Sequence, residues 1–313
     1  MATTSGIATG GADDMIGILI NFVKANGWQQ LDHATEQVNT ETTIDCYQLK
    51  GTDVSGQGNI YVHIIYRKQT TQDIFAFELE GSAGYLPSAD VKQFGQNPQN
   101  SYRDTGTTSS VIVRVPLHRN PIQYWLTASP RRFMGAFRHN ERWGALYCGF
   151  IMPYGLPTQY PYPLWIAGNN ITTNDYKTIV NGCPWGASNV ISGMLYCPSG
   201  RWQSTPLTSG PAGGRGLGIP IWPYKASVAS QRMVYYKPLK DSSNTERYAL
   251  MKQIFYCSNA SEYGTFGEPE GLSFVTGWGA AGGDILTHNG QNWLLVQREM
   301  SSANETSAAM LLE

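Results

Sequence analysis

The segment 111-VIVRVPLHRNPIQYWLTASPRRFMGAFRHNERWGALYCGFI-151 decides the fold, because it has the pattern of successive β-strands joined by short turns. Apolar and aromatic residues recur through it in runs spaced about ten residues apart, which is typical of antiparallel sandwiches and barrels. Ser129-Pro130 and His139-Asn140-Glu141 separate the runs as turns. The segment therefore predicts a meander with strands at 111–115, 123–128, 132–138 and 143–151.

The sequence before this meander predicts one helix followed by more strands. Residues 1–12 are small and polar, and we expect them to form a flexible arm. Asp13 and Asp14 can cap a helix that ends near Gly27, since glycine tolerates the left-handed conformation of a helix terminus. In residues 42–79 the apolar period becomes two, as in a half-buried strand.

Three different patterns follow the meander. Residues 153–168 are rich in proline and predict extended chain that is held mainly by side chains, because proline donates no backbone hydrogen bond. Residues 169–247 are irregular and rich in Gly, Pro and Trp. Strand patterns resume in residues 248–313, where Asn289-Gly290 is a strong hairpin signal and the last strand can pair back on that hairpin.

These patterns predict a mainly β fold, with antiparallel sandwich-like or barrel-like sheets, one N-terminal helix and long irregular loops. The expected organisation is a flexible arm at 1–12, a composite β domain formed by 13–168 and 248–313, and an irregular insertion at 169–247.

Composition narrows the class of protein. The chain of 313 residues has 22 Lys and Arg against 23 Asp and Glu, so it has no excess of positive charge to hold a nucleic-acid backbone. Only 14% of residues are charged, compared with about 25% in typical soluble domains. No segment has the length of a membrane span, and the first residues lack a secretory pattern. The five cysteines are widely spaced, which favours free thiols.

Motifs for catalysis, cofactors and metals are not evident. The glycines of 209–218 lack the spacing of a dinucleotide-binding loop, and the histidines lack metal-ligand spacing, so we expect no cofactor and no metal. Glu268 and Glu270, which flank Pro269, form an acidic pair that could serve a polysaccharide hydrolase. Carboxylates beside a proline in a turn are more often solvated, so we expect no catalytic residues and no enzyme.

Aromatic side chains are the most informative feature. They interleave with prolines in residues 153–168 and continue into the insertion. Three interpretations remain open: contact with another protein, burial within the chain, and a platform for sugars. We favour contact with another protein and assign the candidate interface to Tyr154, Tyr160, Tyr162, Trp165, Trp185, Trp202 and Trp222.

Several segments resemble a family of tailed-bacteriophage virion structural proteins of the tail and neck. The most characteristic is 147-YCGFIMPYG-155, which continues into 159-QYPYP-163. The others are the helix end Asn26-Gly27-Trp28, the strand pair at 46–66, the block 121-PIQYW-125, and the closing hairpin with Gly290, Trp293, Leu295 and Val296.

The resemblance implies a non-enzymatic structural subunit of a phage virion. We expect it to form a homo-oligomeric ring in the neck or tail, of the tail-completion, terminator or collar type, and to contact other tail or neck proteins. It would assemble in the host cytoplasm, with no membrane and no specific nucleic acid as partner. The alternatives are a receptor-binding or carbohydrate-binding tail or baseplate component and, less favoured, a polysaccharide hydrolase.

Overall fold

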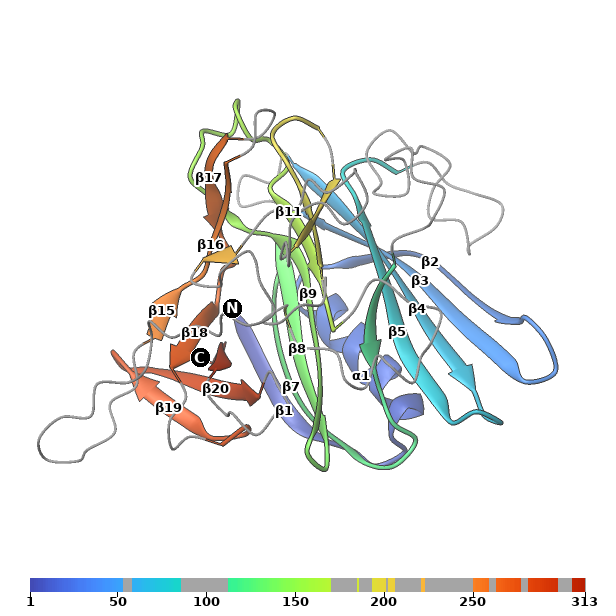
Figure 1. Ribbon diagram of the computed structural model, residues 1–313. Helices are drawn as coiled ribbons and strands as arrows, with labels where there is room; N and C mark the ends of the chain where they lie inside the picture. Colours follow the sequence, from blue (N-terminus) through green and yellow to red (C-terminus); the bar gives the residue numbers. More distant parts are fainter. Residues whose placement is uncertain are drawn as a thin grey trace, which may run out of the picture.

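A computed structural model describes residues 1–52, 58–85, 112–169, 185, 193–200, 202–205, 221–222, 250–258, 263–276, 281–297 and 306–312. These residues form one helix and four antiparallel sheets, so the predicted mainly β class is confirmed. The sheets lie in layers, with the segments drawn in blue and cyan, in green, and in orange and red following one another across Figure 1.

The central sheet holds the last three strands of the predicted meander, whereas the strand predicted at 111–115 pairs with β5 (Ile74–Ser82) as β6 (Val113–Pro116) in another sheet. The strand order of the central sheet is β1-β7-β8-β9-β11-β12-β13, and each neighbouring pair is antiparallel. The predicted turn at His139-Asn140-Glu141 lies between β8 and β9, and Asn140 adopts a positive φ of 54° there. The strands of the central sheet are β1 (Ala2–Ala8), β7 (Ile122–Ser129), β8 (Arg132–His139), β9 (Arg142–Phe150), β11 (Leu164–Ala167), β12 (Gly193–Tyr196) and β13 (Trp202–Thr205).

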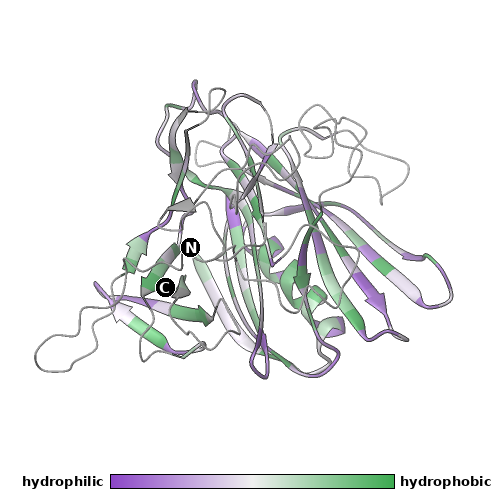
Figure 2. Cartoon of the chain, in the orientation of Figure 1, coloured by the Kyte–Doolittle hydropathy of each residue, from purple (hydrophilic) through white to green (hydrophobic). Residues whose placement is uncertain are grey.

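The N-terminal sheet covers one face of the central sheet. Its order is β2-β3-β4-β5-β6, so each strand pairs with its neighbour in the chain. Buried and half-buried residues alternate along β3 with the period of two that the sequence predicted, whereas β5 is buried along its whole length; Figure 2 shows hydrophilic and hydrophobic residues alternating along the long strands. The strands are β2 (Gln29–Gln37), β3 (Thr42–Thr52), β4 (Asn59–Gln69), β5 (Ile74–Ser82) and β6 (Val113–Pro116).

Two sheets pack on the opposite side of the central sheet. The small sheet has the order β10-β17-β16-β14, with β10 (Met152–Pro153), β14 (Ile221–Trp222), β16 (Ile254–Ser258) and β17 (Tyr263–Glu268). The C-terminal sheet has the order β15-β18-β21-β20-β19, with β15 (Leu250–Lys252), β18 (Leu272–Thr276), β19 (Ile285–His288), β20 (Gln291–Gln297) and β21 (Thr306–Leu312). The predicted Asn289-Gly290 hairpin and the last strand paired on it are both confirmed.

Helix α1 (Ala12–Ala25) fills the space between the central and N-terminal sheets. Its buried face carries Met15, Leu19 and Val23, which repeat at the helical period and are fully buried. Asp13 and Asp14 lie in its first turn, but the predicted side-chain cap is absent and Gly11 holds the N-cap position. Instead the carbonyl of His118 accepts a hydrogen bond from the N–H of Ala12 at 2.8 Å.

Two hydrophobic cores separate the layers. The first lies between the N-terminal and central sheets and includes α1, Ile64, Phe77, Phe137 and Ile166. The second lies on the other face of the central sheet and joins it to the small and C-terminal sheets. Its members include Trp125, Tyr147, Trp165, Phe255, Phe274, Leu294 and Met310. Because the two faces of the central strands supply both cores, the central sheet holds the layers together.

Residues 1–12 differ from the flexible arm expected from the sequence. Residues 2–8 form β1, which pairs along its whole length with β7, more than 110 residues away in the chain. Its sequence, ATTSGIA, carries small residues that pack under Tyr124 and Ile122, and only this distant partner makes it a strand.

The expected irregular insertion also contains regular structure. Residues 193–196 and 202–205 extend the central sheet as β12 and β13, and residues 221–222 join the small sheet as β14. Residues 13–168 and 248–313 were expected to form one composite β domain. They form sheets that stack on each other through the second core.

Candidate interface on the proline-rich arm

Residues 151–163, here called the arm, leave the end of β9 and run along the small sheet before returning as β11. Backbone hydrogen bonds hold both ends: Ile151 donates to the carbonyl of Pro163 at 2.8 Å, and Tyr154 donates to the carbonyl of Phe266 at 3.0 Å. Met152 and Pro153 pair with β17. The arm was expected to be held mainly by side chains, and these backbone bonds show that its non-proline residues also anchor it.

A glycine makes this close approach of two chains possible. A Cβ atom at Gly267 would lie 2.2 Å from the carbonyl oxygen of Met152, far inside van der Waals contact. Only glycine therefore lets β17 pair with the arm at this point.

Tyr160 fixes the middle of the arm to the protein. Its side chain is 3% exposed, its hydroxyl donates to the carbonyl of Tyr196 in β12, and its ring meets Phe266 edge-on at 6.4 Å between centroids. A turn supports it, because the N–H groups of Gln159 and Tyr160 both donate to the carbonyl of Leu156. The arm is thus an ordered feature of the folded chain.

The opposite side of the arm presents apolar side chains to solvent. Met152, Tyr154 and Leu156 alternate along the chain and are 42%, 49% and 64% exposed. We call these three residues the exposed stripe. Large apolar side chains gathered on an ordered surface are typical of contact sites, whereas single ones are ordinary.

Polar groups border the exposed stripe and fix the ring of Tyr154. The Tyr154 hydroxyl donates to Glu268 Oε2 at 3.1 Å, and Lys252 Nζ donates to Glu268 Oε1 at 2.9 Å. Partial burial and the negative charge of Glu268, which also accepts the hydroxyl hydrogen bond, raise the pKa of Tyr154 to about 12. The phenol therefore remains a hydrogen-bond donor throughout the physiological pH range.

The structure separates the seven candidate interface residues. Tyr160, Trp165, Trp185 and Trp202 are buried within the chain, which is the second interpretation that the sequence left open. Tyr154 is exposed, and Tyr162 is partly buried against the first core. The side chain of Trp222 lies outside the described residues.

Trp165 shows how deeply one of these rings is integrated. It is fully buried, its indole N–H donates to Thr205 Oγ1 at 2.8 Å, and its ring contacts Tyr147 and Phe255. The hydrogen bond joins β11 to β13 across β12, so this ring belongs to the second core.

The two glutamates considered for hydrolysis each bind other groups of the protein. Glu268 binds Lys252 and Tyr154, as described above. Glu270 Oε2 lies 3.4 Å from Arg131 Nε and 3.3 Å from Arg132 Nε, on the turn that precedes β18. Since each carboxylate is bound by different basic groups, the pair has the character of inter-sheet ion pairs.

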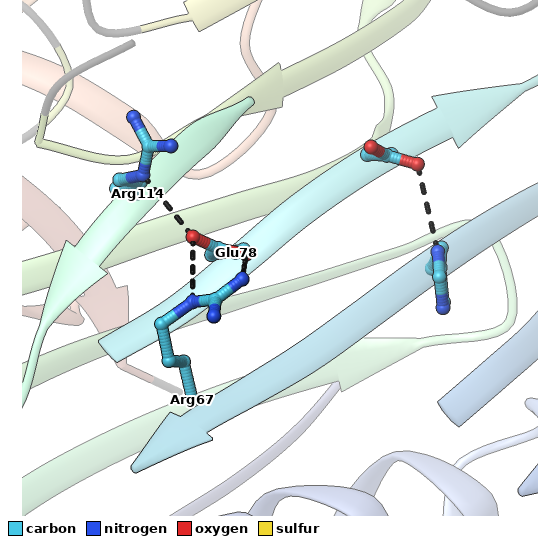
Figure 3. A network of polar contacts seen from close by, with 5 residues as sticks. Arg67, Glu78 and Arg114 are labelled. Atoms are coloured by element: carbon cyan, nitrogen blue, oxygen red, sulfur yellow. Dashed lines mark hydrogen bonds and ion pairs between the residues drawn. The ribbon is translucent and has the colours of Figure 1, made fainter. Parts of the chain in front are cut away.

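Sequence reasoning missed a second set of charged residues, in the N-terminal sheet. Glu78 of β5 accepts hydrogen bonds from Arg67 of β4 at 3.1 and 3.2 Å and from Arg114 of β6 at 3.3 Å (Figure 3). Two residues further along β5, Glu80 lies 3.5 Å from His63 of β4. Glu78, Glu80 and His63 are all at most 2% exposed.

A signal for this cluster was present in the sequence. Phe75, Phe77 and Leu79 alternate with Ala76, Glu78 and Glu80 in β5, so the two carboxylates must share the face opposite the first core. A buried carboxylate between two guanidinium groups is stable only as a complete set, because removal of one partner leaves an unpaired buried charge. This cluster therefore fixes the register of three neighbouring strands.

Two remaining predictions concern the cysteines and membrane-spanning segments. The thiols of Cys46, Cys148 and Cys197 are buried, as expected, while Cys183 and the side chain of Cys257 lie outside the described residues. Burial raises the pKa of the Cys148 thiol. The described part of the chain contains no helix with the length and apolar character to cross a membrane.

Comparison with models of known protein families and with characterised proteins finds no match to this chain.

Proposed function

We propose that this protein is a non-enzymatic structural subunit of a tailed-phage virion, and that it forms a closed ring in the neck or tail. The observation that carries the proposal is the exposed stripe on an arm that the folded chain already orders. Ordering a segment on a partner costs conformational entropy, and a segment ordered in advance avoids most of that cost.

The distribution of exposed apolar residues supports head-to-tail contacts. The exposed stripe lies beside β17, and the exposed Ile285 lies on β19, which is separated from β17 in Figure 1. A contact between the exposed stripe and a different surface of a second copy is heterologous, and such a contact closes into a ring when the rotation per subunit permits.

The interior suits a load-bearing subunit. Three stacked layers share two cores, and the buried Glu78 binds Arg67 and Arg114 of the two adjacent strands. The resemblance of residues 147–163 to virion proteins of tailed phages supports the same function and supplies the location in the neck or tail.

Size-exclusion chromatography with light scattering and electron microscopy of the purified full chain test this proposal. We expect a closed ring as the main species and the chain itself in virions examined by mass spectrometry. A chain that stays monomeric at high concentration and is missing from virions would contradict the proposal.

A carbohydrate-binding tail component is the second candidate. The observation that favours it is the exposed ring of Tyr154 beside the Glu268 carboxylate and the Lys252 ammonium, because sugars bind to an aromatic face flanked by charged hydrogen-bonding groups. A glycan array separates the two candidates: binding that is lost in Tyr154→Ala favours this one, and an array without any binding removes it.

A further inference from the structure

A small pocket lies at turns between strands, on the side of the first core that faces away from the arm. It has a volume of about 100 Å³ and is lined by residues from the turn before β5, the link from β6 to β7, and the adjoining ends of β8 and β9. Its lining includes Asp73, His118, Ile122, Phe137, His139 and Arg142.

Hydrogen bonds fix the proton positions of the two histidines in this lining. His118 and His139 stack with 3.7 Å between ring centroids and 9° between planes. His118 Nδ1 accepts from the N–H of Asn120 at 3.0 Å, so the ring proton of neutral His118 resides on Nε2. His139 Nδ1 donates to the carbonyl of Pro121 at 3.1 Å, and its Nε2 accepts from Asn140 Nδ2 at 3.2 Å.

The two histidines therefore differ in what they can offer a ligand. His139 uses both nitrogens inside the protein, whereas the Nε2–H of His118 has no hydrogen-bond acceptor among the described residues. Burial, followed by the neighbouring His139, lowers the pKa of His118, so the ring is a neutral donor at neutral pH.

The charges around the pocket leave one cation unneutralised. Asp73 is bound by Arg119, with 3.3 Å between Asp73 Oδ1 and Arg119 Nε. Arg142 also lines the pocket, and among the described residues it forms no ion pair. One carboxylate and two guanidinium groups give this region a net positive charge, which favours an anion.

The floor of the pocket is apolar. Ile122 and Phe137 are 1% and 2% exposed and belong to the first core. Trp143 adds an indole whose ring lies under the guanidinium of Arg138, 5.5 Å from its centroid. A ligand that suits both parts of the lining has a negatively charged head and a short hydrocarbon tail.

We propose that this pocket binds a short aliphatic carboxylate, whose head accepts hydrogen bonds from Arg142 and from His118 Nε2–H while its tail lies against Ile122 and Phe137. A volume of about 100 Å³ corresponds to about three water molecules, which limits the ligand to a few carbon atoms. A free short-chain acid and the side chain of a glutamate on a partner protein share this chemistry.

Nuclear magnetic resonance titration of the full chain with butyrate tests the proposal. We expect saturable shifts of the His118 and Arg142 side-chain signals. Arg142→Gln should weaken binding roughly 10- to 100-fold, the loss expected for one charge-assisted hydrogen bond. Lys24→Gln removes the same charge from an exposed site on α1 and should leave binding unchanged. Thermal unfolding of both variants establishes that each remains folded.

Two further ligands complete the experiment. The blocked amino acid N-acetylglutamate N-methylamide distinguishes a glutamate of a partner protein from a free acid. If the blocked amino acid binds and butyrate does not, the pocket binds a glutamate side chain of a partner protein. If only butyrate binds, the pocket binds a free acid. Butylamine has the same length and the opposite charge. Binding of butylamine but of neither carboxylate, or equal binding to wild type and Arg142→Gln, would overturn the proposal.

Discussion

Replacing Tyr160 by alanine should destabilise the whole fold, although this residue lies in the middle of a proline-rich arm. The side chain is 3% exposed, contacts Phe266, and donates its hydroxyl hydrogen to the carbonyl of Tyr196. Removal of a buried aromatic ring costs about 3–5 kcal/mol. At roughly 2–4 °C per kcal/mol for a chain of this order of size, the midpoint of thermal unfolding should fall by roughly 10 °C.

The assay measures thermal and urea unfolding of wild type and three variants, with tryptophan fluorescence as the signal. Tyr160→Phe keeps the ring and loses only the hydrogen bond, so it should cost about 1–2 kcal/mol. Tyr154→Ala removes a half-exposed ring from the same arm and should change the free energy of unfolding by roughly 0.5 kcal/mol or less. Equal effects of Tyr154→Ala and Tyr160→Ala, or an unchanged stability of Tyr160→Ala, would refute the assignment of inner and outer sides to the arm.

Three further predictions concern buried or bound polar groups. Glu78→Gln should lower the free energy of unfolding by about 3–5 kcal/mol in urea titrations, because the buried guanidinium of Arg114 and the partly buried guanidinium of Arg67 lose their counter-charge, while the exposed control Glu41→Gln should have little effect. Tyr154 should ionise at a pH of about 12, so its contribution to stability should be present below pH 10 and be lost as the pH rises through 12. The difference in ultraviolet absorbance between wild type and Tyr154→Phe measures the ionisation of Tyr154. Ionisation near pH 10 would contradict the prediction. Cys46, Cys148 and Cys197 should react with a thiol reagent only after urea unfolding, and their rapid reaction in the native protein would show that they are accessible.

Local patterns allowed much of the fold to be predicted. β7, β8 and β9 pair with their chain neighbours, so the turns at Ser129-Pro130 and Asn140 were sufficient to place them, whereas β6 leaves the predicted meander and pairs with β5. Asn289 and Gly290 adopt positive φ values of 51° and 76°, the conformation that the Asn-Gly pair favours in hairpins.

Long-range pairing could not be predicted in the same way. The sequence of β1 has no strong strand pattern, and its pairing with β7 depends on residues 122–128. Trp165 has the same proline-rich surroundings as Tyr154, yet its indole N–H meets Thr205, 40 residues later, inside the second core. An aromatic residue in an extended segment can face either way, and the choice depends on which distant strands cover it.

Local patterns were likewise insufficient to decide which residues of the candidate interface are exposed. Sequence reasoning selected the aromatic residues of the arm and the insertion as a candidate interface, but it could not separate buried rings from exposed ones. It also missed Met152 and Leu156, although both alternate with Tyr154 and share its exposed side. The alternation of apolar residues across Pro153 and Gly155 was the available signal.

The central claim is that the exposed stripe joins one subunit to the next. Light scattering on Leu156→Asp tests it most directly, because Leu156 is 64% exposed and its replacement places a charge in the contact without affecting a core. Val38→Asp is the matched control, since Val38 is 48% exposed in the link between β2 and β3 and lies outside the arm. We predict a ring for wild type and Val38→Asp and a folded monomer for Leu156→Asp; a ring of unchanged mass in Leu156→Asp would contradict the claim.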